Sequence, residues 1–88
     1  MTENTIVCNI DLFSLDQQVY LVKNSEATKI GTTPLATLPY YLVQSCHQYS
    51  SKVIHLYGSE SYIEDITNTI TTYNKNDFSN NDIRIEVN

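Results

Sequence analysis

Positive charge is scarce in this 88-residue chain, which has five lysines and arginines against ten acidic residues and a net charge of −5. The few cations are also scattered along the sequence, at Lys23, Lys29, Lys52, Lys75 and Arg84. Proteins that bind a phosphate backbone cluster such residues on one surface. We therefore expect no nucleic-acid partner and no attraction to an anionic membrane surface.

Long apolar runs and closely spaced cysteines are missing as well. No apolar run approaches the roughly 20 residues of a membrane span, and residues 1–4 lack the basic start and apolar stretch of a signal peptide. Cys8 and Cys46 fall on separate predicted elements and outside any CxxC spacing, so nothing favours a zinc or dithiol site. We expect a cytoplasmic protein with two buried free thiols, no membrane contact and no cofactor.

The segments that are present are short and typical of an α/β fold. A chain of this length forms one domain, and we assign residues 1–88 to it. Alternating and continuous apolar patterns, bounded by turn residues, predict five strands. The predicted strands are residues 5–13, 18–23, 27–32, 52–57 and 82–88.

Two helices are predicted between the later strands. The first has an N-cap at Thr37, Pro39 in its first turn and an apolar stripe at helical spacing over residues 38–49. The second covers residues 60–73 and carries Glu60 at its N-terminus, where the helix dipole favours negative charge.

The element order β-β-β-α-β-α-β predicts a two-layer α/β domain. Short connections make the first three strands an antiparallel meander, and each later crossover through a helix adds a parallel strand. Since such crossovers are right-handed, two that step the same way place both helices on one face of the sheet. We expect a five-stranded mixed sheet in the order 3-2-1-4-5.

The hairpin of residues 6–12 and 18–22, followed by a third strand and alternating helices and strands, resembles the core of the ribonuclease H-like superfold, which actin-like ATPase domains share. In those families an aspartate near the end of the first strand serves a metal or a nucleotide, and the resemblance places Asp11 there. Actin-like phosphate loops continue with glycines, which residues 12–15 lack. Nuclease families need further carboxylates, of which Glu60 would be one. The resemblance implies a fold and no activity.

The second face of the predicted sheet is the candidate binding surface. If both helices cover the first face, the second carries a mixture of aromatic, polar and charged side chains, of the kind enriched in protein interfaces. The candidate site residues are Asn9, Asp11, Phe13, Tyr20, His55, Tyr57 and Arg84. An ordinary solvated sheet face is the alternative interpretation of the same pattern.

Two functions fit these observations. We expect a non-enzymatic protein-interaction module or a homodimerising adaptor that uses this face, because no complete catalytic set accompanies it. The alternative is a minimal metal-dependent nuclease or phosphotransferase in which Asp11 and Glu60 hold one divalent ion, since hard cations prefer oxygen ligands. The competing interpretation of these carboxylates is a solvated strand end and a solvated helix start. His55 is interpreted as a packed strand residue, and no catalytic residue is assigned.

Overall fold

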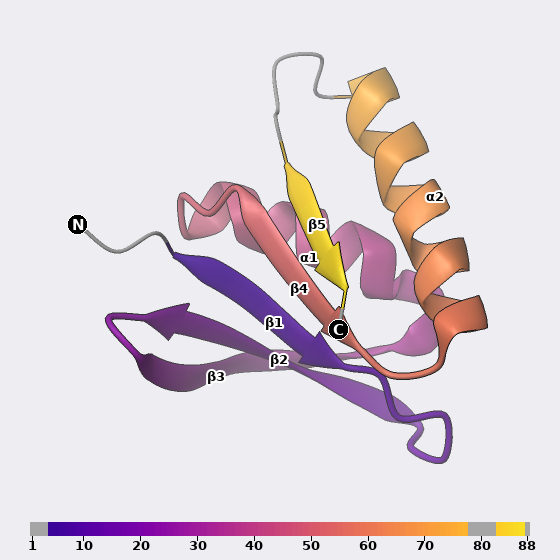
Figure 1. The fold of residues 1–88 in the computed structure, drawn as a ribbon, viewed down its shortest axis with the longest axis horizontal. Helices are drawn as coiled ribbons and strands as arrows, with labels where there is room; N and C mark the ends of the chain where they lie inside the picture. The colour runs from indigo at the N-terminus through magenta and orange to yellow at the C-terminus, as the bar shows by residue number, and fades with distance from the viewer. Residues whose placement is uncertain (1–3, 78–82, 88) are drawn as a thin grey trace.

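The computed structural model describes residues 4–77 and 83–87, and its element order confirms the predicted β-β-β-α-β-α-β pattern. The elements are β1 (Thr5–Asn9), β2 (Asp16–Lys23), β3 (Glu26–Pro34), the 3₁₀ turn η1 (Leu35–Thr37), α1 (Leu38–Gln48), β4 (Val53–Tyr57), α2 (Glu60–Asp77) and β5 (Arg84–Val87). Figure 1 looks onto the sheet, with α1 behind it.

The strands form one sheet in the order β3-β2-β1-β4-β5, as predicted. β1, β2 and β3 pair antiparallel, whereas β4 and β5 add parallel strands on the other side of β1. The β2–β3 turn consists of Asn24 and Ser25, which both have a positive φ, at 53° and 66°. Two-residue hairpins need this left-handed backbone at both positions, and Asn adopts it with little cost.

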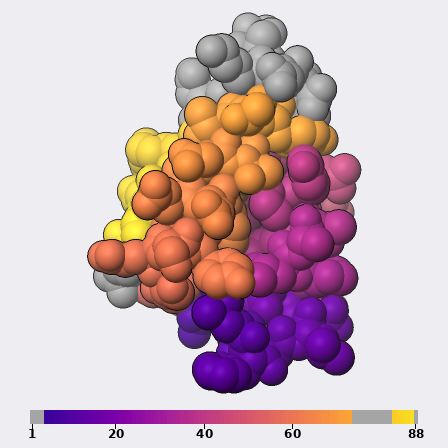
Figure 2. All heavy atoms as spheres, turned by 90° about the vertical axis from the view of Figure 1, so that its right-hand side faces the viewer, coloured from indigo at the N-terminus to yellow at the C-terminus, as the bar shows by residue number. Residues whose placement is uncertain are grey.

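Both helices cover the same face of the sheet, as the crossovers predicted. Alternate strand residues and the inward stripes of the two helices pack into a single core. Its members are Ile6, Cys8, Ile10, Val19, Leu38, Leu42, Val43, Cys46, Ile54, Leu56, Ile63, Ile66 and Ile70. Figure 2 shows α1 and α2 side by side on this side of the molecule. Within the described residues, no helix covers the reverse face of the sheet.

The helix α1 begins where the sequence predicts it, but its cap differs. Thr37 is the N-cap residue, yet its side chain makes no hydrogen bond to the first turn of the helix. Its hydroxyl instead donates to the Pro34 carbonyl oxygen at 3.2 Å and pairs with the Thr33 hydroxyl. Thr37 therefore stabilises the 3₁₀ turn that leads from β3 into α1.

Several predicted boundaries are wrong or incomplete. β2 begins at Asp16 rather than at residue 18, and β3 continues to Pro34 rather than to residue 32. The first strand ends at Asn9 rather than at residue 13, because a turn built on Asp11 follows it. The second helix continues to Asp77 rather than ending at residue 73, since residues 74–77 contain no Pro or Gly to stop it. The fifth strand is confirmed over Arg84–Val87, while its predicted ends, Asp82 and Asn88, lie outside the described residues.

The two cysteines are free and buried in the core, as predicted. Burial disfavours the thiolate and raises the pKa of both Cys8 and Cys46 from 9.0 to about 11. We expect the native protein to resist alkylation by iodoacetamide at about pH 8, and both thiols to react once the chain is unfolded in denaturant. Mass spectrometry of the two samples measures this, and rapid labelling of the native protein would contradict it.

The same shifts predict how stability depends on alkaline pH. A thiol with a raised pKa in the folded state contributes stability that is fully present below pH 9.0 and is lost as the pH rises toward about 11. We therefore expect the melting temperature to fall over that range.

Candidate functional site

The reverse face of the sheet, called the open face below, is defined by the strand register. One row of neighbouring residues crosses all five strands: Lys29, Tyr20, Val7, His55 and Glu86. Residues two positions away along each strand point to the same side. Since the core residues of each strand alternate with these, the row lies on the side turned away from the helices.

An apolar depression lies on the open face over β1, β2 and the start of β3. It is lined by Val7, Asn9, Tyr20, Val22, Ala27 and Tyr57. Three candidate site residues predicted from the sequence, Asn9, Tyr20 and Tyr57, are therefore brought together. Apolar and aromatic surface of this kind is a common feature of protein-binding sites.

A cluster of polar and charged groups borders this depression on β4 and β5. The rings of His55 and Tyr57 stack with their centroids 4.5 Å apart and an interplanar angle of 10°. His55 Nδ1 lies 3.8 Å from Glu86 Oε1, and Arg84 Nε lies 3.6 Å from Glu86 Oε2. One carboxylate thus lies between the imidazole and the guanidinium, and this side of the face presents donors, acceptors and charges of both signs.

A polar depression adjoins the apolar one at the end of β1. Asn9 and Tyr20 line both depressions, and Asp11, Ser14, Asp16, Gln17 and Gln18 complete the polar one. The Tyr20 hydroxyl donates to Gln18 Oε1 at 2.8 Å. The open face therefore changes from apolar at its centre to acidic and amide-rich at this end.

The aspartate of the predicted metal or nucleotide site serves a local structural purpose. Asp11 Oδ1 accepts a hydrogen bond from the Phe13 backbone N–H, and Oδ2 accepts one from the Ser14 hydroxyl, both at 3.0 Å. The Ser14 N–H also donates to the Asp11 carbonyl oxygen at 3.2 Å. Both carboxylate oxygens therefore hold the β1–β2 turn, as is typical of Asp at the first position of a turn.

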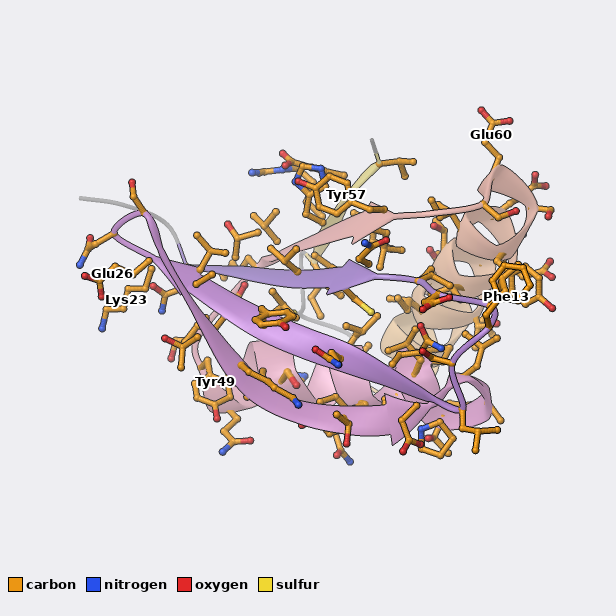
Figure 3. All side chains as sticks on the ribbon, turned by 90° about the horizontal axis from the view of Figure 1, so that it is seen from below. Phe13, Lys23, Glu26, Tyr49, Tyr57 and Glu60 are labelled. Carbon is orange, nitrogen blue, oxygen red and sulfur yellow. The ribbon has the colours of Figure 1, made fainter. Side chains whose placement is uncertain are left out.

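Phe13 and Leu12 lie elsewhere than the sequence predicts. Both fall within the predicted first strand, residues 5–13, where alternation would turn Phe13 to the candidate face and Leu12 to the helices, but both lie in the turn after β1. Leu12 is 45% exposed instead of packed in the core, and Phe13 is fully exposed. Figure 3 places Phe13 at the end of the sheet, away from Tyr57. Phe13 is therefore not part of the open face.

The second proposed metal ligand, Glu60, is the first residue of α2 and is exposed. Figure 3 shows its side chain pointing outward from the start of the helix, at a distance from the turn that carries Phe13. Across residues 4–77 and 83–87, no three or more His, Cys, Asp or Glu side chains come together in a way that could hold a metal ion. Glu60 fits the interpretation as a solvated helix start, whereas Asp11 lies beyond the end of β1 and holds the turn with both carboxylate oxygens instead of being merely solvated.

Several residues of the open face were missed from the sequence. Val22, Ala27 and Lys29 lie on it, because β2 and β3 extend the sheet beyond Tyr20. The period-two alternation counted from Tyr20 would have found Val22, whereas Ala27 and Lys29 depend on the register of β3. Val53 has the register of the open face, but it is buried, with an exposed fraction of 2%.

Comparison of the chain with known protein families and with curated proteins found no match. In the described part of the chain, neither helix is long and apolar enough to cross a membrane.

Proposed function

We propose that this protein is a non-enzymatic protein-interaction module that docks through its open face. The observation that carries the proposal is the apolar depression formed by Val7, Tyr20, Val22, Ala27 and Tyr57 on a sheet face that the two helices leave uncovered. Val7, Tyr20, Val22 and Tyr57 are each half-buried, and partly accessible apolar and aromatic side chains that gather in one place are common at protein-binding surfaces. Tyrosine also contributes large binding energies at the centres of interfaces.

The distribution of charge favours a second copy of the chain as the partner. A chain with a net charge of −5 repels itself where its acidic residues gather. Many of these lie away from the centre of the open face, among them Asp11 in the β1–β2 turn and Glu60, Glu64 and Asp65 on α2. The apolar depression is lined by no charged residue, and the edge strands of the open face carry Lys29, Arg84 and Glu86, so self-repulsion is weaker across this face.

Two further observations support a binding role over the metal-dependent alternative. The Asp11 carboxylate is occupied by the β1–β2 turn, and the Glu60 side chain points outward from the start of α2. The free buried thiols suit the reducing cytoplasm. The resemblance to the ribonuclease H-like core is retained as a proposal about the fold, supported by the strand order 3-2-1-4-5.

A pair of single substitutions tests the open face. We expect the protein to self-associate in sedimentation velocity, and Tyr57→Ala to weaken the association constant about tenfold or more, because truncating a central aromatic residue removes most of its contacts. Phe13→Ala is the matched control, since it removes an exposed aromatic ring that lies off the face. An equal decrease of the association constant in both variants would contradict the proposal. A wild-type protein that stays monomeric up to about 0.5 mM would contradict it as well.

A further inference from the structure

The central row of the open face carries opposite charges at its two ends. Lys29 lies on the edge strand β3 and Glu86 on the opposite edge strand β5, with Tyr20, Val7 and His55 between them. Four strand spacings of about 4.8 Å separate the two ends, or about 19 Å. Lys29 and Glu86 of one chain are thus too far apart to pair with each other.

A twofold axis along β1 would bring these ends together in a dimer. Two sheets commonly pack face to face with their strands nearly aligned, about 10 Å apart. Rotation by 180° about an axis parallel to β1, between the sheets, places β3 of one copy over β5 of the other. Such an interface is isologous, so every contact it makes occurs twice.

The residues of the row are complementary under this rotation. Lys29 falls opposite Glu86 of the second copy, Tyr20 falls opposite its His55, and Val7 falls opposite Val7 at the axis. The contacts are a pair of opposite charges, a pair of rings and a pair of valines. A twofold axis across the strands would instead place Lys29 over Lys29 and Glu86 over Glu86, which like-charge repulsion disfavours.

We propose that the open face binds the open face of a second copy about a twofold axis along β1, so that Lys29 of each copy pairs with Glu86 of the other. This inference rests on the function proposed above and adds the orientation of the two copies and the residues that pair between them. The angle of about 30° between packed sheets displaces the ends of the row by a few ångströms. The long lysine side chain reaches across such a displacement.

Charge reversal at each end of the row tests the orientation. Lys29→Glu places two acidic residues opposite each other at both ends of the dimer, and Glu86→Lys places two basic residues there. We expect each variant alone to weaken self-association about tenfold or more at low salt. Mixing the two variants recreates an opposite-charge pair at both ends, and we expect a heterodimer with the wild-type affinity. The double variant should also regain it.

Lys23→Glu is the control, because it changes the net charge equally at the end of β2, where Lys23 alternates with the open-face residue Val22 and so has the register of the opposite face. Figure 3 shows Lys23 beside Glu26 at the β2–β3 turn. A thermal melt of each variant checks that the monomer remains folded. If the wild type forms a dimer that Tyr57→Ala weakens, but mixing the two charge-reversed variants does not restore dimer formation, the proposed orientation is wrong and the proposed function stands. If the wild type is monomeric, both proposals fail.

Discussion

Gly58→Ala is expected to lower the free energy of unfolding by about 3 kcal/mol and the melting temperature by about 15 °C. Gly58 joins β4 to α2 with φ at +133°, a backbone conformation that residues with a side chain rarely adopt. A Cβ atom there would also lie 2.9 Å from the Ile10 carbonyl oxygen and 3.1 Å from Ile10 Cβ. Neither neighbour can move easily, since Ile10 is buried and its N–H donates to the Tyr57 carbonyl oxygen at 2.8 Å.

The only other glycine in the chain provides the matched control. Gly31 lies in β3 without a positive φ, and a Cβ atom there would overlap the hydroxyl oxygen of Tyr41 and lie 3.1 Å from its ring carbon Cζ, so the outer end of this half-buried side chain must shift. That hydroxyl donates a long hydrogen bond of 3.4 Å to the Ile30 carbonyl oxygen. We expect Gly31→Ala to cost no more than about 1 kcal/mol. Denaturant unfolding measures the free energy of unfolding of the two variants. An equal decrease in both would show that the positive φ of Gly58 contributes little to the cost of the Gly58 substitution.

The arrangement of the sheet was predictable from the sequence because it depends on long-range regularities. Alternation in residues 5–9 and the helical stripes of α1 and α2 each show one buried side, and the continuous apolar run of β4 marks a central strand. Short connections and right-handed crossovers then leave few ways to arrange the strands. The open face follows from the same reasoning, since a helix stripe that points inward must cover one face of the sheet.

The parts that were not predictable depend on single side chains. Ile10 and Leu12 continue the alternation of β1, yet only Ile10 is buried, because the Asp11 carboxylate turns the chain directly after it. A period-two pattern cannot show where a turn begins when an apolar residue happens to follow in register. Phe13 was misplaced for this reason. It entered the candidate site only as a member of a strand that ends at Asn9.

The corrected candidate site is smaller and more central than the predicted one. Asn9, Tyr20 and Tyr57 line one depression, and His55 and Arg84 border it through Glu86. Asp11 contributes from the β1–β2 turn to the polar depression beside it. The sequence indicated which kinds of side chain face away from the helices. The register of β3, which places Lys29 in the row, required the structure.

Gln17 is the residue that links this turn to the sheet, and its loss is expected to have the second large effect. Its side chain is buried, with an exposed fraction of 1%, although glutamine is usually exposed. Gln17 Oε1 accepts from the Asp11 N–H at 2.7 Å, and Nε2 donates to the Asp11 carbonyl oxygen at 2.8 Å and to the Ser14 carbonyl oxygen at 3.4 Å. The amide group thereby replaces the strand partner that the backbone of Asp11 lacks.

Gln17→Met keeps the length of the side chain and removes both hydrogen-bonding groups. We expect the free energy of unfolding to fall by about 2 kcal/mol, because partly buried backbone groups lose their partners. Hydrogen exchange at the Asp11 amide should accelerate at least about tenfold, since a loosened turn opens more often. Gln18→Met is the matched control, because this neighbouring glutamine is exposed. The side-chain hydrogen bond described for it is the one that its Oε1 accepts from the Tyr20 hydroxyl. The free energy of unfolding of the Gln18 variant should stay within about 0.5 kcal/mol of the wild-type value. An unaltered exchange rate at Asp11 in the Gln17 variant would show that the turn holds without this amide.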